Sequence, residues 1–212
     1  MKIAFIGIGN VGFALANNFE KKGHIISIAS DNSTSDSVKK ALTQNPNFNV
    51  LSKQQAIDEA EIIFLATPFQ AIEEALKGLS FNGKTLVDCT NPVGAGISHS
   101  LKSEKSGSEI IQSLAADAKV VKAFTIYGYE NLIHSDFPNY NSKPAMLIAG
   151  DSIVAKKLVT TLCNDINFDA IDTGRIDQAL HLEHMTLLWV KMVRRDGHHP
   201  NFVWSYLENN PQ

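Results

Sequence analysis

A chain of 212 residues with 44% hydrophobic and 19% charged residues has the composition of a globular protein with one large domain. Its formal net charge of −3 argues against a basic nucleic-acid-binding surface, and no stretch reaches the ~18–20 apolar residues of a membrane-spanning helix. Two cysteines, Cys89 and Cys163, provide no disulfide framework and are typical of a reducing compartment. We therefore expect a cytoplasmic protein that binds neither nucleic acid nor a membrane.

The chain begins with a predicted strand, a glycine-rich turn and a helix. Residues 2–6 are apolar after Lys2, which predicts a strand buried on both faces. Apolar residues at intervals of four then predict a helix that ends before Gly23. Between strand and helix lies a G-x-G-x-x-G sequence in which every position is a candidate for cofactor binding: Gly7, Ile8, Gly9, Asn10, Val11 and Gly12.

This order of strand, turn and helix is the context in which the G-x-G-x-x-G motif binds a dinucleotide. Gly7 permits the tight turn, Gly9 lets the backbone approach a pyrophosphate, and Gly12 lets the helix pack closely on the strand. The free N–H groups and the dipole of the helix N-terminus then face the phosphates. The alternative interpretation is a glycine-rich turn that binds nothing.

The segments that follow alternate between predicted strands and helices. Strands are expected at 25–29, 48–51, 61–66, 85–88 and 119–124, and helices at 36–42, 54–60, 68–76 and 109–116. Such an alternation predicts an α/β fold with a Rossmann-type, doubly wound, mostly parallel sheet. The Gly- and Ser-rich stretch 95–108 is interpreted as a long loop and 125–141 as irregular.

The C-terminal part is predicted to add two strands, at 145–151 and 168–172, and a long helix from 176 to 193. We divide the chain into a dinucleotide-binding domain, 1–174, and a small C-terminal helical segment, 175–212. Apolar residues near the end of the chain indicate a surface that a second subunit could cover, so a homodimer is expected. These residues are Trp189, Met192, Phe202 and Trp204.

Ligands of open parallel sheets bind beyond the carboxyl ends of the strands. We expect the adenosine half of a dinucleotide near the loop after 25–29, and the nicotinamide half near the loops after 85–88 and 119–124. The loop after 61–66 would line the middle. The candidate cofactor-binding residues in these loops are Ser30, Asp31, Asn32, Ala66, Thr67, Pro68, Asn91, Pro92, Phe124 and Thr125.

Asp31 bears on the choice between the two nicotinamide dinucleotides. An acid about 20 residues past the motif bonds the ribose 2′-OH and favours NAD(H), whereas an Arg there accepts the 2′-phosphate of NADP(H). Asp31 lies nineteen residues past Gly12 and by this rule favours NAD(H). As an alternative, Asp31 is only a turn residue, as Asp-Asn sequences commonly are.

No other pattern predicts catalytic chemistry. His181 and His184 lie beside Glu183 but lack the H-E-x-x-H spacing and a third ligand, so no metal is expected. Cys89 has no adjacent His or Lys in the sequence to lower its pKa, and it is predicted to be a small buried residue rather than a nucleophile. Hydride transfer needs no nucleophile, because the cofactor carries the chemistry. We therefore assign no catalytic residue.

The motifs, taken in order, resemble the NADPH-dependent oxidoreductases of the deazaflavin coenzyme F420 and their bacterial dinucleotide-binding relatives. The cytoplasmic reductase domain of the six-transmembrane metalloreductases is a more distant likeness. The resemblance implies an NADP(H)-binding domain that passes hydride to a flavin-like acceptor, often in a homodimer. It covers nearly the whole chain and rests on the glycine motif and on the segments 88–92, 120–124, 149–151, 182–183 and 188–189.

Two positions depart from these relatives. Members often carry Ser-Arg after the second strand, where this chain has Ser30-Asp31, so NADP(H) and NAD(H) both stay open. Members often read Phe-Asn-Thr where this chain has Phe124-Thr125-Ile126. The sequence predicts an NAD(P)H-dependent reductase of a small redox acceptor. The alternatives are a dinucleotide sensor or scaffold without turnover, and a small hydroxyacid- or pyrroline-carboxylate-type dehydrogenase whose site a dimer partner completes.

Overall fold

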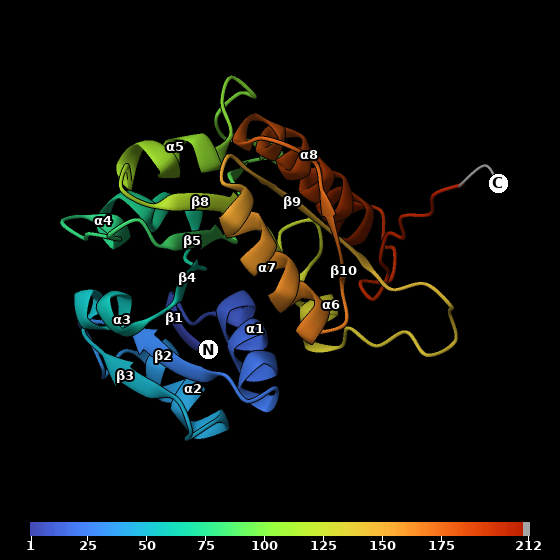
Figure 1. Cartoon of the computed structure of the whole chain (residues 1–212). Helices are drawn as coiled ribbons and strands as arrows, with labels where there is room; N and C mark the ends of the chain where they lie inside the picture. Colours follow the sequence, from blue (N-terminus) through green and yellow to red (C-terminus); the bar gives the residue numbers. More distant parts are fainter. Residues whose placement is uncertain (210–212) are drawn as a thin grey trace.

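The computed structural model describes residues 1–209, which form an eight-stranded sheet with helices on both faces (Figure 1). Six strands run parallel in the order β3-β2-β1-β4-β5-β8, which is the strand order of the doubly wound dinucleotide-binding fold. The predicted Rossmann-type α/β fold is therefore confirmed. These strands are β1 (Lys2–Ile6), β2 (Ile25–Ala29), β3 (Asn49–Leu51), β4 (Ile62–Leu65), β5 (Thr85–Asp88) and β8 (Lys119–Lys122).

The sheet continues beyond β8 with a reversal of direction. β9 (Ala145–Gly150) pairs antiparallel with β8, and β10 (Asp169–Asp172) pairs parallel with β9. α7 (Ile153–Asp165) connects these last two strands. The carboxyl ends of β9 and β10 consequently lie at the edge of the sheet opposite to the carboxyl ends of the first six strands.

The side chains of each central strand alternate between two hydrophobic clusters, one on each face of the sheet. Ile3 and Phe5 of β1 pack in the cluster that includes α1 (Asn10–Lys21), α2 (Asp36–Gln44), α6 (Tyr129–Ile133) and α7. Ala4 and Ile6 pack in the cluster that includes α3 (Lys53–Glu59), α4 (Ile72–Leu76) and α5 (Gly107–Leu114). Burial on both faces explains why β1 is apolar at every position after Lys2.

α8 (Ala179–Val190) covers one end of the molecule, where it contacts α5, β9 and the short strand β7 (Ser98–His99). The aromatic residues after it pack on one another: the rings of Trp189 and Phe202 lie 6.1 Å apart, and those of Phe202 and Trp204 lie 5.6 Å apart. Trp189 is thus covered by the chain's own C-terminal segment. The domain boundary at 174/175 and the homodimer stay predictions.

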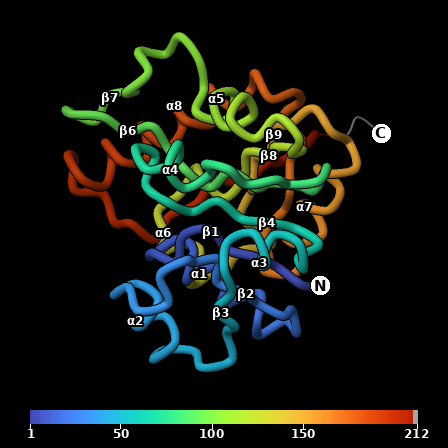
Figure 2. Tube along the Cα trace, turned by 90° about the vertical axis from the view of Figure 1, so that its left-hand side faces the viewer, coloured from blue at the N-terminus to red at the C-terminus, as the bar shows by residue number. Residues whose placement is uncertain are grey.

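Several loops contain more structure than the sequence predicted. The stretch 95–108, predicted as one long loop, contains β7 (Ser98–His99), which pairs with β6 (Val93–Gly94) just before it. This hairpin projects at one end of the molecule (Figure 2). The stretch 125–141 contains α6. α5 begins at Gly107, earlier than predicted, because Ser106 and Glu109 form a capping box. Among residues 1–209, no helix has the length and apolar composition needed to span a membrane.

Candidate functional site

The glycine motif forms the turn from β1 to α1. Gly7 has a φ of 95°, and a Cβ added there would lie 2.7 Å from the carbonyl carbon of Ala66. A Cβ added to Gly12 would lie 2.3 Å from the carbonyl oxygen of Gly7, whereas one added to Gly9 would meet nothing within 4 Å. The fold itself therefore requires Gly7 and Gly12, while Gly9 borders open space.

The N-terminus of α1 opens onto the same space. Gly9 is its N-cap residue, and no side chain caps the helix. Gly9 and Asn10 are both exposed. The first N–H groups of a helix have no intrahelical partner, and together with the helix dipole they favour an anion. This turn can bind a pyrophosphate in the way that the sequence predicted.

The loop after β2 carries Ser30, Asp31 and Asn32. The Ser30 hydroxyl accepts the Asn32 N–H at 3.2 Å, so these residues form a tight polar turn. Asp31 turns toward α3: its Oδ1 accepts the backbone N–H of Lys53 at 3.1 Å, and its Oδ2 lies 3.4 Å from Lys53 Nζ. Its side chain is nevertheless 62% exposed. Asp31 thus stabilises the start of α3 and still borders the edge where a ribose is expected.

The other predicted residues follow β4, β5 and β8, which are neighbours in the sheet. Ala66, Thr67 and Pro68 follow β4, Asn91 and Pro92 follow β5, and Phe124 and Thr125 follow β8, so the structure brings these loops to one edge. Three of these residues are buried: Pro92, Phe124 and Thr125.

Phe124 has an unexpected orientation. It adopts a left-handed φ of 58°, and its ring packs in the core 5.8 Å from the ring of Phe64 and 6.3 Å from that of Phe19. Its backbone N–H points to the sulfur of Met146 at 3.1 Å. A non-glycine residue in this region is strained. The left-handed conformation turns the chain at this residue. The ring of Phe124 therefore points into the core, and only its backbone lies at the sheet edge beside Thr125.

Three polar atoms in these strand-end loops are buried without a hydrogen-bond partner among residues 1–209: Thr67 Oγ1, Asn91 Oδ1 and Thr125 Oγ1. A buried polar atom left unpaired costs about 1–3 kcal/mol, so three of them at adjacent strand ends indicate a polar ligand. A nicotinamide carboxamide has N–H donors for an amide oxygen and a carbonyl that accepts from hydroxyl groups. The residues present therefore fit the nicotinamide end of a dinucleotide.

A cavity of about 440 Å³ lies beside the glycine motif. Its volume falls in the range of about 300–1,000 Å³ that is typical of small-molecule sites. α1, α2 and α6 enclose it, and it combines aromatic walls with one lysine. The lining residues are Ile8, Gly9, Asn10, Phe13, Ser37, Lys40, Ala41, Gln44, Tyr129 and Ile133.

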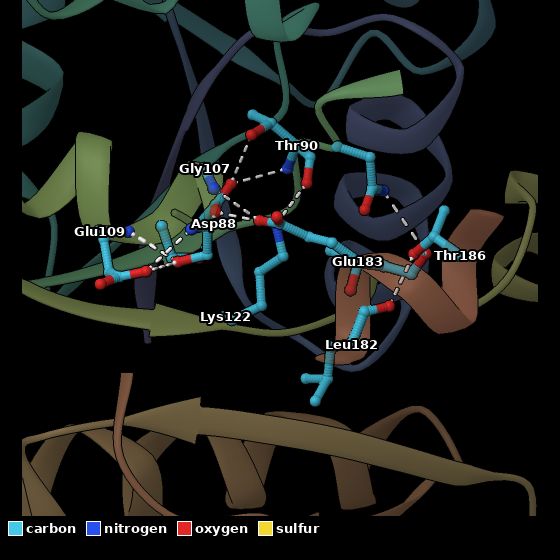
Figure 3. A network of polar contacts seen from close by, with 12 residues as sticks. Asp88, Thr90, Gly107, Glu109, Lys122, Leu182, Glu183 and Thr186 are labelled. Carbon is cyan, nitrogen blue, oxygen red and sulfur yellow. Dashed lines mark hydrogen bonds and ion pairs between the residues drawn. The ribbon is translucent and has the colours of Figure 1, made fainter. Parts of the chain in front are cut away.

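Behind the strand-end loops lies a buried polar network centred on Lys122 (Figure 3). The Lys122 ammonium donates to Asp88 Oδ2 at 3.0 Å and to the Thr90 carbonyl at 2.6 Å, and it lies 3.1 Å from Glu183 Oε1. Burial lowers the pKa of Lys122, but the carboxylates of Asp88 and Glu183 outweigh it and raise that pKa above its ordinary value. The ammonium is therefore charged and uses all three of its donors.

The two carboxylates extend the network. Asp88 Oδ1 accepts the N–H and the hydroxyl of Thr90, at 2.8 and 2.7 Å, while its Oδ2 also accepts the Ser108 hydroxyl at 2.6 Å. Glu183 Oε1 accepts the Gly107 N–H at 2.9 Å, and its Oε2 lies 2.8 Å from His99 Nε2. Every carboxylate oxygen has a partner, so this network ties β5, β8, α5, β7 and α8 together.

Cys89 lies next to this network and is buried. Burial first, and then the Asp88 carboxylate, raise the pKa of its thiol well above the ordinary value. The prediction that Cys89 is a small buried residue is confirmed. In the part of the chain that the structure describes, no three His, Cys, Asp or Glu side chains form a group that could hold a metal ion.

The sequence patterns did not predict the network around Lys122. One local signal was present, because Lys122 is the only charge within the apolar run 120–124. A cation at a buried strand position requires a partner. The partner Glu183, and Thr186 one turn further along α8, are too distant in sequence for any local pattern to connect them with the strand ends.

Comparison with known proteins gives a family match for the N-terminal part of the chain, which contains the glycine motif. Residues 2–92 match the family described as NADP oxidoreductase, coenzyme F420-dependent. Over this N-terminal segment the chain is similar to that family. The resemblance that the sequence motifs predicted is thereby confirmed for the region that contains β1 to β5.

Among curated proteins, the metalloreductase STEAP3 of Rattus norvegicus is 27% identical over 189 residues, which are 88% of this chain but 36% of that protein. The chain thus spans about a third of the length of this relative. A proposed F420-dependent NADP reductase of Arthrobacter sp. FB24 has a TM-score of 0.78 at 24% identity, with 98% of this chain and 100% of that chain covered.

A reductive aminase of Aspergillus terreus, solved with NADPH and ethyl levulinate, has a TM-score of 0.64 at 17% identity. The likeness covers 91% of this chain and 61% of the aminase. At such identities these two solved structures establish the fold that the chain shares with members of the F420-dependent NADP oxidoreductase family and with other dinucleotide-binding proteins.

Proposed function

We propose that the chain is an NAD(P)H-dependent reductase that transfers hydride from a nicotinamide dinucleotide to a small, flavin-like redox acceptor. The observation that carries this proposal is the set of unpaired buried atoms at Thr67, Asn91 and Thr125, which lies along the same sheet edge as the glycine turn. The match of residues 2–92 to a family of NADP oxidoreductases supports it.

The residues act by binding and orientation. When bound, the dinucleotide supplies the hydride. Gly9 and the free N–H groups of α1 bind the pyrophosphate, and Asn91 and Thr125 orient the carboxamide. The turn residues and the covered loops exclude water from the reacting atoms. Burial of Cys89 disfavours its thiolate, so hydride transfer proceeds without a protein nucleophile, and the proton comes from solvent.

We assign the acceptor to the cavity beside the motif. Phe13 and Tyr129 offer apolar ring surface for a planar acceptor, and Lys40 offers a positive charge. Tyr129 begins α6 four residues after Thr125, so the cavity wall directly follows the nicotinamide loop in the chain. A homodimer and a cytoplasmic location complete the proposal. The exposed apolar side chains of Leu188 and Leu207 support the homodimer, and two free cysteines support a reducing compartment.

A stopped-flow experiment tests this function. Purified protein is titrated with NADPH and NADH, and the bound dinucleotide is then mixed with a deazaflavin, FMN, a quinone or a ferric chelate while absorbance at the nicotinamide band is followed. We expect binding below millimolar concentration and oxidation by one acceptor class. Absence of binding of both dinucleotides at millimolar concentration would overturn the proposal. Binding without oxidation by any acceptor would favour the dinucleotide sensor.

Asp31→Arg is expected to shift the dinucleotide preference toward NADPH by about tenfold or more, since a charge-assisted hydrogen bond to the 2′-phosphate contributes about 1.5–3 kcal/mol. Affinities for NADPH and NADH are measured by nicotinamide fluorescence. Asp31→Asn is the matched control, because it keeps an acceptor for the Lys53 N–H while removing the charge. An unchanged NADPH-to-NADH ratio in Asp31→Arg would mean that residue 31 faces away from the ribose.

A further inference from the structure

Two side chains of α8 reach the two loops that carry the unpaired atoms Asn91 Oδ1 and Thr125 Oγ1. We propose that Glu183 and Thr186 are positioning residues, which hold these loops in the geometry that receives the nicotinamide. This inference rests on the proposed function, and it assigns part of the site to a helix that follows the dinucleotide-binding sheet.

The first connection runs through a buried ion pair. Glu183 is 1% exposed, and its Oε1 lies 3.1 Å from Lys122 Nζ, which in turn donates to the carbonyl of Thr90 at 2.6 Å (Figure 3). Thr90 directly precedes Asn91. Because Lys122 has no contact with solvent, the position of its ammonium is set by Glu183 together with Asp88. Glu183 therefore helps to fix the position of the Asn91 loop.

The second connection is direct. The hydroxyl of Thr186 donates to the carbonyl of Thr125 at 2.9 Å, within reach of the Leu182 carbonyl at 3.1 Å. The Thr125 carbonyl also lies 3.5 Å from Asn91 Nδ2. The two nicotinamide loops thus meet at one carbonyl oxygen, and Thr186 fixes that oxygen from behind.

A single rigid element makes both connections. Residues 183 and 186 are three apart, which places them on the same face of a helix. β10 ends at the far edge of the sheet, so α8 runs back toward the ligand edge, where it contacts β7. Sites held by helices are more precise than sites held by loops alone, and small displacements of a reacting group are costly for catalysis.

The test compares two ligands that differ in the nicotinamide. Dissociation constants of NADPH and of 2′-phospho-ADP-ribose are measured by calorimetry for wild type and for Thr186→Val, which keeps the shape of the side chain and removes its donor. If wild type binds NADH more tightly than NADPH, the same comparison is made with NADH and ADP-ribose. We expect Thr186→Val to weaken NADPH binding about three- to tenfold, as for the loss of one hydrogen bond, and to leave 2′-phospho-ADP-ribose unchanged.

Two variants separate positioning from a general structural effect. Thr186→Ser restores the hydroxyl and is expected to restore the NADPH affinity. Thr160→Val is the matched control, because Thr160 on α7 also donates to the carbonyl four residues earlier, at 3.0 Å, but lies on a helix away from the site. It is expected to change neither affinity. Glu183→Gln is expected to weaken NADPH binding and to leave 2′-phospho-ADP-ribose binding unchanged, as Thr186→Val does. If Glu183→Gln does not fold, the Thr186 variants alone test the proposal.

The outcomes are distinct. Failure of wild type to bind either ligand would overturn the proposed function. Binding of both ligands by wild type, with an unchanged affinity ratio in Thr186→Val, would overturn the positioning role alone. An equal loss for both ligands, or no recovery in Thr186→Ser, would also overturn it, because a global disturbance does not depend on the nicotinamide.

Discussion

Lys122→Met is expected to lower the free energy of unfolding by about 3–5 kcal/mol, since removing one partner of a buried ion pair leaves its counter-charges unpaired. In this chain two carboxylates, Asp88 and Glu183, would lose the cation that both of them contact. For a protein of this size each kcal/mol corresponds to about 2–4 °C, so the melting temperature should fall by roughly 6–20 °C. Urea and thermal unfolding followed by circular dichroism measure both quantities.

The control is Lys157→Met, at an exposed position of α7. A surface substitution of this kind is expected to change stability by less than about 0.5 kcal/mol. A second control is a double-mutant cycle: Glu183→Gln should cost less in the Lys122→Met background than in wild type, because the two substitutions remove the same interaction. A loss below about 1 kcal/mol in Lys122→Met, or strict additivity in the cycle, would contradict the network as described.

The contribution of Lys122 also has a defined pH dependence. Its pKa in the folded state is raised above the ordinary value of 10.5, mainly by Asp88 and Glu183 against the opposing effect of burial. Stability from a group with a raised pKa is fully present below the unfolded-state pKa and is lost as the pH rises through the folded-state pKa. The difference between wild type and Lys122→Met should therefore stay constant through neutral pH and shrink only above pH 10.5.

Two of the motif glycines, Gly12 and Gly9, should respond in opposite ways to substitution by alanine. Gly12→Ala places a Cβ 2.3 Å from the Gly7 carbonyl oxygen, so it should destabilise the protein by about 1–3 kcal/mol or more and displace α1. Gly9→Ala meets nothing within 4 Å at a φ of −72°, so its stability should stay within about 0.5 kcal/mol of wild type.

Dinucleotide affinity completes this comparison. Gly9→Ala should weaken NADPH binding by about tenfold or more, because its methyl group occupies the space through which the pyrophosphate approaches the backbone. Calorimetric titration measures the affinity, and thermal unfolding of the same samples measures stability. Wild-type affinity in Gly9→Ala would mean that the phosphates do not bind at this turn. Wild-type stability in Gly12→Ala would contradict the close packing of α1 on β1.

Local patterns were sufficient to predict most of the fold. The apolar run at 2–6, the glycine spacing and the Gly23 end of the first helix are all signals contained within a few residues, and the structure has β1, the turn and α1 there. The direction of β9 was not predictable in this way. A strand has the same local pattern in a parallel or an antiparallel pair, and the long connection from 123 to 144 permits either.

The same difference between local and long-range signals applies to the candidate site. The glycine turn is local, and its geometry follows from sequence. The ring of Phe124 points into the core because this residue has a left-handed φ. The position of a residue after a strand does not predict such a φ. Glu183 and Thr186 act across the fold on residues far from them in sequence, so only the arrangement of α8 identifies them.

The reversed direction of β9 and β10 also indicates where the molecule can be attached to a surface without covering the ligand edge. The turn at 150–152 and the turn at 172–175 lie at the edge away from the dinucleotide, since β9 and β10 run opposite to the first six strands. Gly150 itself is packed against the Val120 carbonyl and has no room for a side chain, but Lys157 is exposed on the helix that follows. Lys157→Cys would provide an exposed thiol, whereas Cys89 and Cys163 are buried, so a surface linker coupled to it would immobilise molecules in one orientation with the ligand edge facing solution.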